Sequence, residues 1–186
     1  MSRKKLLYFA YCVNMLSSRM ECCVDKSCVR KGLGKLEGHV LMFGSYNKVW
    51  QGCLPTIVPV KDKSAVVWGA LWQVEQCLQP KLDTLQGVAS RIYEPIEVDI
   101  SALRAKGGTF KAISYRLIPE PPVPELYKGK PKMRFRPSKL YLEEMQEGAE
   151  ESCLPIYYRR YLKTISHNGY TGSVLPDLRT EEEPMY

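Results

Sequence analysis

Histidine is scarce in this chain of 186 residues, which contains only His39 and His167. Two histidines cannot build a His-rich metal centre. The seven cysteines include no C-x-x-C pair. Cys22, Cys23 and Cys28 lie close together in the sequence, but their spacing differs from that of the usual paired zinc ligands. The sequence therefore predicts no metal site.

Long apolar runs are also missing. No stretch approaches the ~18 apolar residues of a membrane span. Residues 6–13 are too short and too rich in tyrosine for a secretory leader. Because the cysteine count is odd and no leader is expected, free thiols in a reducing compartment are favoured. We therefore expect a cytoplasmic protein with no membrane contact.

Generic catalytic motifs are absent as well. The chain has no Walker A sequence and no G-x-S-x-G motif. The glycines at positions 32, 34 and 38 miss the dinucleotide fingerprint by one residue. Neither histidine carries a local signature of a Cys–His catalytic pair, although that pairing stays open. No cofactor is expected from these patterns.

The chain has an ordinary globular composition, with 45% hydrophobic and 25% charged residues, so one domain over residues 1–172 is expected. Its net charge of +7 is uneven. The first 36 residues hold eight basic residues against two acidic ones, and residues 173–186 form an acidic tail. Residues 119–137, rich in proline, form a basic arm with cations at alternate positions. These are Lys128, Lys130, Lys132, Arg134 and Arg136.

The basic arm has two interpretations. It is either ordinary solvated surface or a face that attracts a negatively charged protein partner. Nucleic-acid binding is a third and less favoured hypothesis, because Tyr127 and Phe135 lie in the arm but no RNA- or DNA-binding signature accompanies them.

Hydrophobic patterning predicts an α+β fold on a curved or closed sheet. Strands are expected at 6–12, 36–43, 56–60, 65–74, 91–100 and 110–118, with a chain break at 32–34. A short helix or loop is expected at 14–19, and a helix interrupted at Pro80 over 74–85. A further helix is expected from 137 to 147, ended by Gly148. The last helix begins at 154, with a core-facing stripe. The stripe is Tyr158, Tyr161, Leu162 and Ile165.

An ordered series of short segments runs through residues 6–173. It comprises 7–14 (LYFAYCVN), 14–19 (NMLSSR), 50–57 (WQGCLPTI), 67–72 (VWGALW), 82–88 (LDTLQGV), 93–98 (YEPIEV), 137–141 (PSKLY), 154–155 (LP) and 168–172 (NGYTG). In this order and spacing the series resembles the gamma-glutamylcyclotransferase family. The resemblance implies a small mixed β-barrel with packed helices.

The resemblance also implies a chemistry. Members of the family cyclise gamma-glutamyl amides, including gamma-glutamyl amino acids, glutathione and gamma-glutamyl amines, to 5-oxoproline without cofactor or protein nucleophile. Backbone N–H groups of the first loop hold the substrate, and a glutamate moves the proton. Carried over, the substrate-binding positions are Tyr8, Phe9, Ala10, Tyr11, Cys12, Val13, Asn14 and Tyr141. Because Tyr8 and Tyr11 are three apart, they are expected on opposite faces of a strand, so that one belongs only to the core.

The chain departs from the family pattern at the residues that matter most. Gln86 stands at the position of the family's glutamate, and a neutral amide cannot take up a proton near pH 7. Cys12-Val13 stands where the family has Gly-Ser, and glycine there can adopt angles that other residues avoid. The first hypothesis is therefore a pseudoenzyme that binds a gamma-glutamyl ligand, a protein partner or a second copy of itself. The alternative is an active enzyme with a relocated base, which Asp83, or Glu143 or Glu144, would supply.

Overall fold

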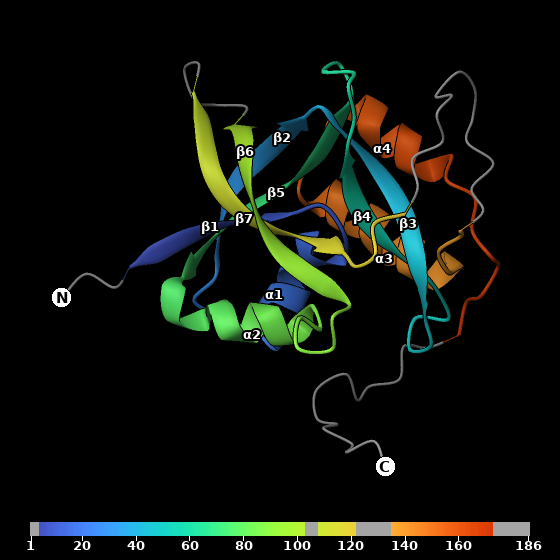
Figure 1. The fold of residues 1–186 in the computed structure, drawn as a ribbon, viewed down its shortest axis with the longest axis horizontal. Coiled ribbons are helices and arrows are strands. Elements are labelled where there is room, and N and C mark those ends of the chain that lie inside the picture. The colour runs from blue at the N-terminus through green and yellow to red at the C-terminus, as the bar shows by residue number, and fades with distance from the viewer. Residues whose placement is uncertain (1–3, 103–107, 122–134, 173–186) are drawn as a thin grey trace, which may run out of the picture.

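The computed structural model describes residues 4–102, 108–121 and 135–172 (Figure 1). Lys128, Lys130, Lys132 and Arg134 of the basic arm, and the whole acidic tail, lie outside the described residues. Only Arg136 of the five arm cations is described.

Seven strands and four α-helices make up the described fold. The strands are β1 (Lys5–Ala10), β2 (Val29–Glu37), β3 (His39–Asn47), β4 (Gly52–Pro59), β5 (Val66–Glu75), β6 (Tyr93–Ala102) and β7 (Thr109–Leu117). The α-helices are α1 (Ser17–Cys23), α2 (Gln79–Leu85), α3 (Lys139–Glu151) and α4 (Ile156–Lys163). Two 3₁₀ turns precede α1 and α2, namely η1 (Val13–Met15) and η2 (Gln76–Leu78). No helix of the described ranges is both long and apolar enough to cross a membrane.

Five strands close into a barrel in the order β1-β5-β2-β6-β7, and β3 pairs with β4 in a separate hairpin (Figure 1). Strands β1 and β7 run parallel where Tyr8 pairs with Ile113, whereas the other barrel pairs are antiparallel. The barrel is therefore mixed, which confirms the fold that the resemblance implied. Strand β5 lies between β1 and β2, in agreement with its nearly continuous apolar sequence.

The chain break expected at residues 32–34 is wrong, because these residues lie inside β2. A β-bulge shifts the register between Arg30 and Gly32, and Gly32 has a φ of +137°. At Gly34 a Cβ would lie only 2.6 Å from Ile100 Cγ2. The glycines thus serve strand irregularity and close packing across the barrel rather than a loop.

The expected strand at 36–43 also has a different form. It combines the end of β2 with the start of β3, and Gly38, with a φ of +67°, makes the turn between them. Strand β3 then continues past Gly44 to Asn47 through a bulge before Tyr46. Apolar patterning could not separate the strands because Leu36, Val40 and Leu41 are all buried.

The helices follow the sequence more closely. Pro80 lies in the first turn of α2, where its missing N–H costs nothing, so the expected interruption is the junction between η2 and α2. Helix α3 runs through Gly148 to Glu151 instead of ending there, and the glycine lets the helix pack closely on Met15. In α4, Tyr158 and Leu162 face the core as expected, but Tyr161 is 39% exposed.

Candidate functional site

The chain turns sharply where β1 ends. After Ala10 it passes through Cys12 into η1, whose residues Val13, Asn14 and Met15 are buried. Cys12 has φ −129° and ψ −150°, an extended conformation open to any residue. The turn therefore forms here without the angles that only glycine adopts readily. What the cysteine adds is a side chain, not strain.

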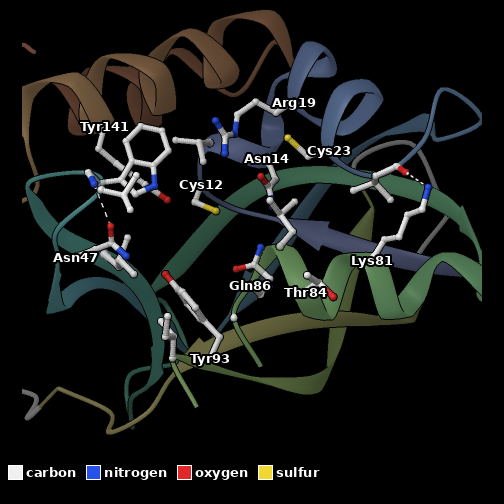
Figure 2. A pocket seen from close by; sticks show the side chains of 18 of the residues that line it. Cys12, Asn14, Arg19, Cys23, Asn47, Lys81, Thr84, Gln86, Tyr93 and Tyr141 are labelled. Atoms are coloured by element: carbon white, nitrogen blue, oxygen red, sulfur yellow. Dashed lines mark hydrogen bonds between the residues drawn. The ribbon is translucent and has the colours of Figure 1, made fainter. Parts of the chain in front are cut away.

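A cavity of about 910 Å³ opens beside this turn (Figure 2). Its walls come from η1, α1, α2, the β3–β4 hairpin, β6 and α3. The polar and aromatic residues that line it are Cys12, Asn14, Arg19, Cys22, Cys23, Asn47, Trp50, Lys81, Thr84, Gln86, Tyr93 and Tyr141. The volume lies within the range typical of small-molecule sites.

Gln86 caps the C-terminal end of α2 and points into the cavity (Figure 2). The next residue, Gly87, has a φ of +64°, the left-handed conformation that commonly ends a helix. The Nε2 of Gln86 donates to the Tyr8 hydroxyl at 3.3 Å, and the Nδ2 of Asn14 donates to the same oxygen at 3.0 Å. Burial raises the pKa of Tyr8, so the hydroxyl stays neutral. Tyr8 thus fixes both amides without itself lining the cavity.

None of the three candidate replacement carboxylates is among the residues that line this cavity. Asp83 accepts a hydrogen bond from the Tyr115 hydroxyl at 2.6 Å. Glu144 pairs with Arg19, with 3.5 Å between Oε2 and Nη1. Glu143 pairs with Lys139 and lines a second cavity of about 470 Å³. Of the described residues that line the cavity beside Gln86, none is an aspartate or a glutamate.

Two cations do line the cavity. The guanidinium of Arg19 lies 5.1 Å from the centroid of the Trp50 ring, and its buried Nε has no hydrogen-bond partner. The Nζ of Lys81 donates to the Val24 carbonyl at 3.1 Å and lies 3.9 Å from an Asp25 oxygen. The described part of the wall therefore presents positive charge to a ligand and no formal negative charge.

The thiol of Cys12 lies near the middle of the cavity, between Gln86 and Arg19 in Figure 2. Burial raises its pKa, more than hydrogen bonds such as that with the Tyr141 hydroxyl lower it. Tyr141 is held edge-on against Trp50, with ring centroids 4.6 Å apart. Cys12 is consequently a neutral thiol at pH 7 and a poor nucleophile.

The structure divides the predicted substrate-binding residues into two groups. Cys12, Val13, Asn14 and Tyr141 line the cavity together with Gln86. The others, Tyr8, Phe9, Ala10 and Tyr11, are buried and are not among its lining residues.

Sequence reasoning missed the two cations that line the cavity, and it placed Tyr11 in a strand that ends one residue earlier. The Tyr11 hydroxyl donates to the Tyr115 carbonyl at 2.6 Å, and because β1 ends at Ala10 the strand alternation does not extend to Tyr11. Sequence reasoning assigned no role to Arg19 or Lys81. Arg19 belongs to the matched segment 14–19, whereas Lys81 carried no signal.

Arg136, the one described cation of the basic arm, lines the second cavity and not the cavity beside Gln86.

The chain is similar to curated gamma-glutamylcyclotransferases. It is 30% identical over 179 residues to those of Bos taurus and Homo sapiens, covering 94% of this chain and 86% of each relative. The model of the AIG2-like family matches residues 66–162. A solved structure of a gamma-glutamyl cyclotransferase superposes with a TM-score of 0.77 at 28% identity, covering 93% of this chain and 95% of that one. The crystal structure of an uncharacterised human protein gives a TM-score of 0.76 at 29% identity, with 92% and 94% coverage. This chain belongs to the gamma-glutamylcyclotransferase family.

Proposed function

We propose that this protein binds a small gamma-glutamyl-type carboxylate in the cavity beside Gln86 and converts it to 5-oxoproline slowly or not at all. The observation that carries the proposal is the absence of any carboxylate from the described lining of the cavity. The curated relatives are named for cyclotransferase activity, which supports a gamma-glutamyl compound as the class of ligand.

The chemistry explains why a carboxylate matters. During cyclisation the α-amino group of the substrate must lose a proton as it attacks the γ-carbonyl, and the leaving amine must gain one. The Gln86 amide can donate or accept a hydrogen bond but cannot exchange a proton near pH 7. Loss of general acid–base catalysis typically lowers a rate by about 10²–10⁴. The cavity would still orient a ligand, so binding survives where turnover does not.

Asp83 is the competing candidate for the base. Its Oδ1 accepts a hydrogen bond at 2.6 Å from the hydroxyl of Tyr115, a residue of the barrel strand β7. Because Asp83 does not line the cavity, its side chain would have to move to reach a substrate there. An active enzyme with Asp83 as its base therefore remains the alternative, to be separated by experiment.

The test is an assay of 5-oxoproline formation from gamma-glutamyl-alanine and from glutathione, together with calorimetric binding of both. We expect binding with little or no turnover by the wild-type protein. Gln86→Glu should raise turnover by about 10²-fold or more. Gln76→Glu makes the same change at an exposed position outside the cavity and should have no effect.

Robust wild-type turnover that disappears in Asp83→Asn, with the variant still folded, would overturn the proposal and establish the relocated base. If neither compound binds, the proposal is also contradicted. Unfolding curves of each variant separate loss of function from loss of fold.

A further inference from the structure

The charge of the cavity wall is one-sided. Arg19 and Lys81 both line it, and no described lining residue is acidic. Figure 2 shows the two cations at separate places around Gln86, Arg19 from α1 and Lys81 from α2. A carboxylate in the cavity can therefore meet either of two cations. This arrangement attracts carboxylates.

The carboxylates near Arg19 and Lys81 leave both cations able to bind a ligand. Glu144 lies 3.5 Å from Arg19 and Asp25 lies 3.9 Å from Lys81, and neither is a lining residue. Both separations exceed the 2.7–2.9 Å of a strong charge-assisted hydrogen bond. The guanidinium of Arg19 also keeps a buried Nε without a partner. The cations thus retain capacity for a negatively charged ligand.

The cavity offers fewer favourable partners to a positively charged ligand group than to a carboxylate. Gln86 and Asn14 both direct an amide N–H to Tyr8, so each can offer an ammonium group only a neutral side-chain oxygen. The side-chain oxygen of Asn47 accepts from the Trp50 backbone N–H at 3.0 Å. What remains for an ammonium group is neutral oxygen. Hydrogen bonds between a cation and a neutral acceptor are weaker than those to a carboxylate.

We propose that the cavity selects carboxylates without an ammonium group over gamma-glutamyl compounds that carry one. The favoured class includes glutaryl amides and cyclic lactam acids such as 5-oxoproline. This inference rests on the proposed function, because it names the ligand class of the same cavity. It rests on the neutral amide at position 86, where the family resemblance implies an acidic side chain, and on the two cations that line the same cavity.

The experiment uses two ligands that differ only in the ammonium group, glutaryl-L-alanine and gamma-L-glutamyl-L-alanine. Calorimetric titration of the full chain at pH 7 should give at least about tenfold tighter binding of glutaryl-L-alanine. The ammonium group of gamma-L-glutamyl-L-alanine would enter the cavity without a carboxylate to pair with. Gln86→Glu should reduce that ratio at least tenfold, because the new carboxylate pairs with the ammonium group. Gln76→Glu is the matched control and should leave the ratio unchanged.

A second pair of variants tests the cations. Lys81→Gln should weaken both ligands several-fold. Lys163→Gln, an exposed lysine paired with Glu150 and outside this cavity, should weaken neither. Equal effects of the two lysine changes would mean that only overall charge matters and would overturn the assignment of the cavity. Unfolding midpoints confirm that each variant is folded.

The outcomes distinguish this inference from the proposed function. If gamma-L-glutamyl-L-alanine binds as tightly as glutaryl-L-alanine, or more tightly, and is not turned over, the inference fails and the proposed function stands. If neither ligand binds, or if gamma-L-glutamyl-L-alanine is turned over rapidly, both fail.

Discussion

The side-chain amide of Gln86 donates to the hydroxyl of Tyr8 at 3.3 Å, which links the end of α2 to the first strand of the barrel. Tyr8 is only 2% exposed and also accepts from Asn14. A single buried oxygen therefore orients two amides of the cavity wall. This link ties the candidate site to the core, so the same residue affects both stability and binding.

We predict that Tyr8→Phe destabilises the protein by about 1–3 kcal/mol, because it leaves two amide donors without their acceptor. Urea denaturation of both proteins measures the difference. Tyr46→Phe is the matched control, since Tyr46 is 59% exposed and its hydroxyl contacts only Gln51 in the described structure; it should cost less than about 0.5 kcal/mol. Equal losses would show that the buried hydroxyl is not special.

Gly69 allows β5 to pass close to the end of β1. A Cβ at this position would collide with the Ala10 carbonyl oxygen and lie 2.8 Å from Phe9 Cε2. Gly69→Ala should therefore cost about 1–3 kcal/mol of stability and weaken ligand binding, because the site turn begins at Ala10. Gly108→Ala should be nearly neutral, because no atom of the described residues lies within 4 Å of a Cβ at this position. Thermal unfolding and calorimetry provide the measurements, and a neutral Gly69→Ala would contradict the close approach.

The thiols should differ strongly in reactivity. Burial raises the pKa of Cys12, whereas Cys77 is exposed. Since the thiolate is the reactive form, iodoacetamide at pH 7.5 should label Cys77 readily and Cys12 slowly. Peptide mapping by mass spectrometry follows both sites in one sample, and labelling of Cys12 should increase as the pH is raised. Rapid labelling of Cys12 at pH 7.5 would contradict its burial, and a bound ligand should slow it further.

Glu151 joins α3 to β2 and to the start of α1. Burial alone raises its pKa, but hydrogen bonds from Ser17 and from Arg30, the latter at 2.7 Å, outweigh burial and hold the pKa below its usual value. A lowered pKa means that this stabilisation is present above the unfolded value near ~4.3 and disappears as the pH falls through the folded value. Arg30 also stacks on Trp72, 4.7 Å from the ring centroid.

Glu151→Gln should accordingly cost about 0.5–1 kcal/mol at pH 7, because the pair is partly exposed. The difference from wild type should shrink as the pH falls below about 4. Urea denaturation at several pH values measures it. Glu21→Gln, a change on the exposed face of α1, is the control and should show no such pH dependence. A cost that persists unchanged at low pH would mean that Glu151 acts by packing instead of by charge.

Much of the fold could be anticipated from local pattern. Strand β5 and helix α4 were predicted because a continuous apolar run and a helical stripe are local signals. Strand β2 was missed because Gly32 and Gly34 resemble loop residues, and only the bulge and the packing on Ile100 explain them. The turn at Gly38 was missed because apolar residues lie on both sides of it.

The candidate site divides in the same way. Sequence order alone identified the segment of Cys12 and Asn14 and the segment of Gln86, because family motifs are local. Tertiary structure alone decided that Asp83 bonds to Tyr115 and does not line the cavity, and that Arg19 and Lys81 do. The sequence determined which chemical groups the chain carries, including a neutral amide at position 86. Folding decided which of them share the cavity, because the walls come from segments as far apart as positions 12 and 141, and their spacing depends on barrel closure.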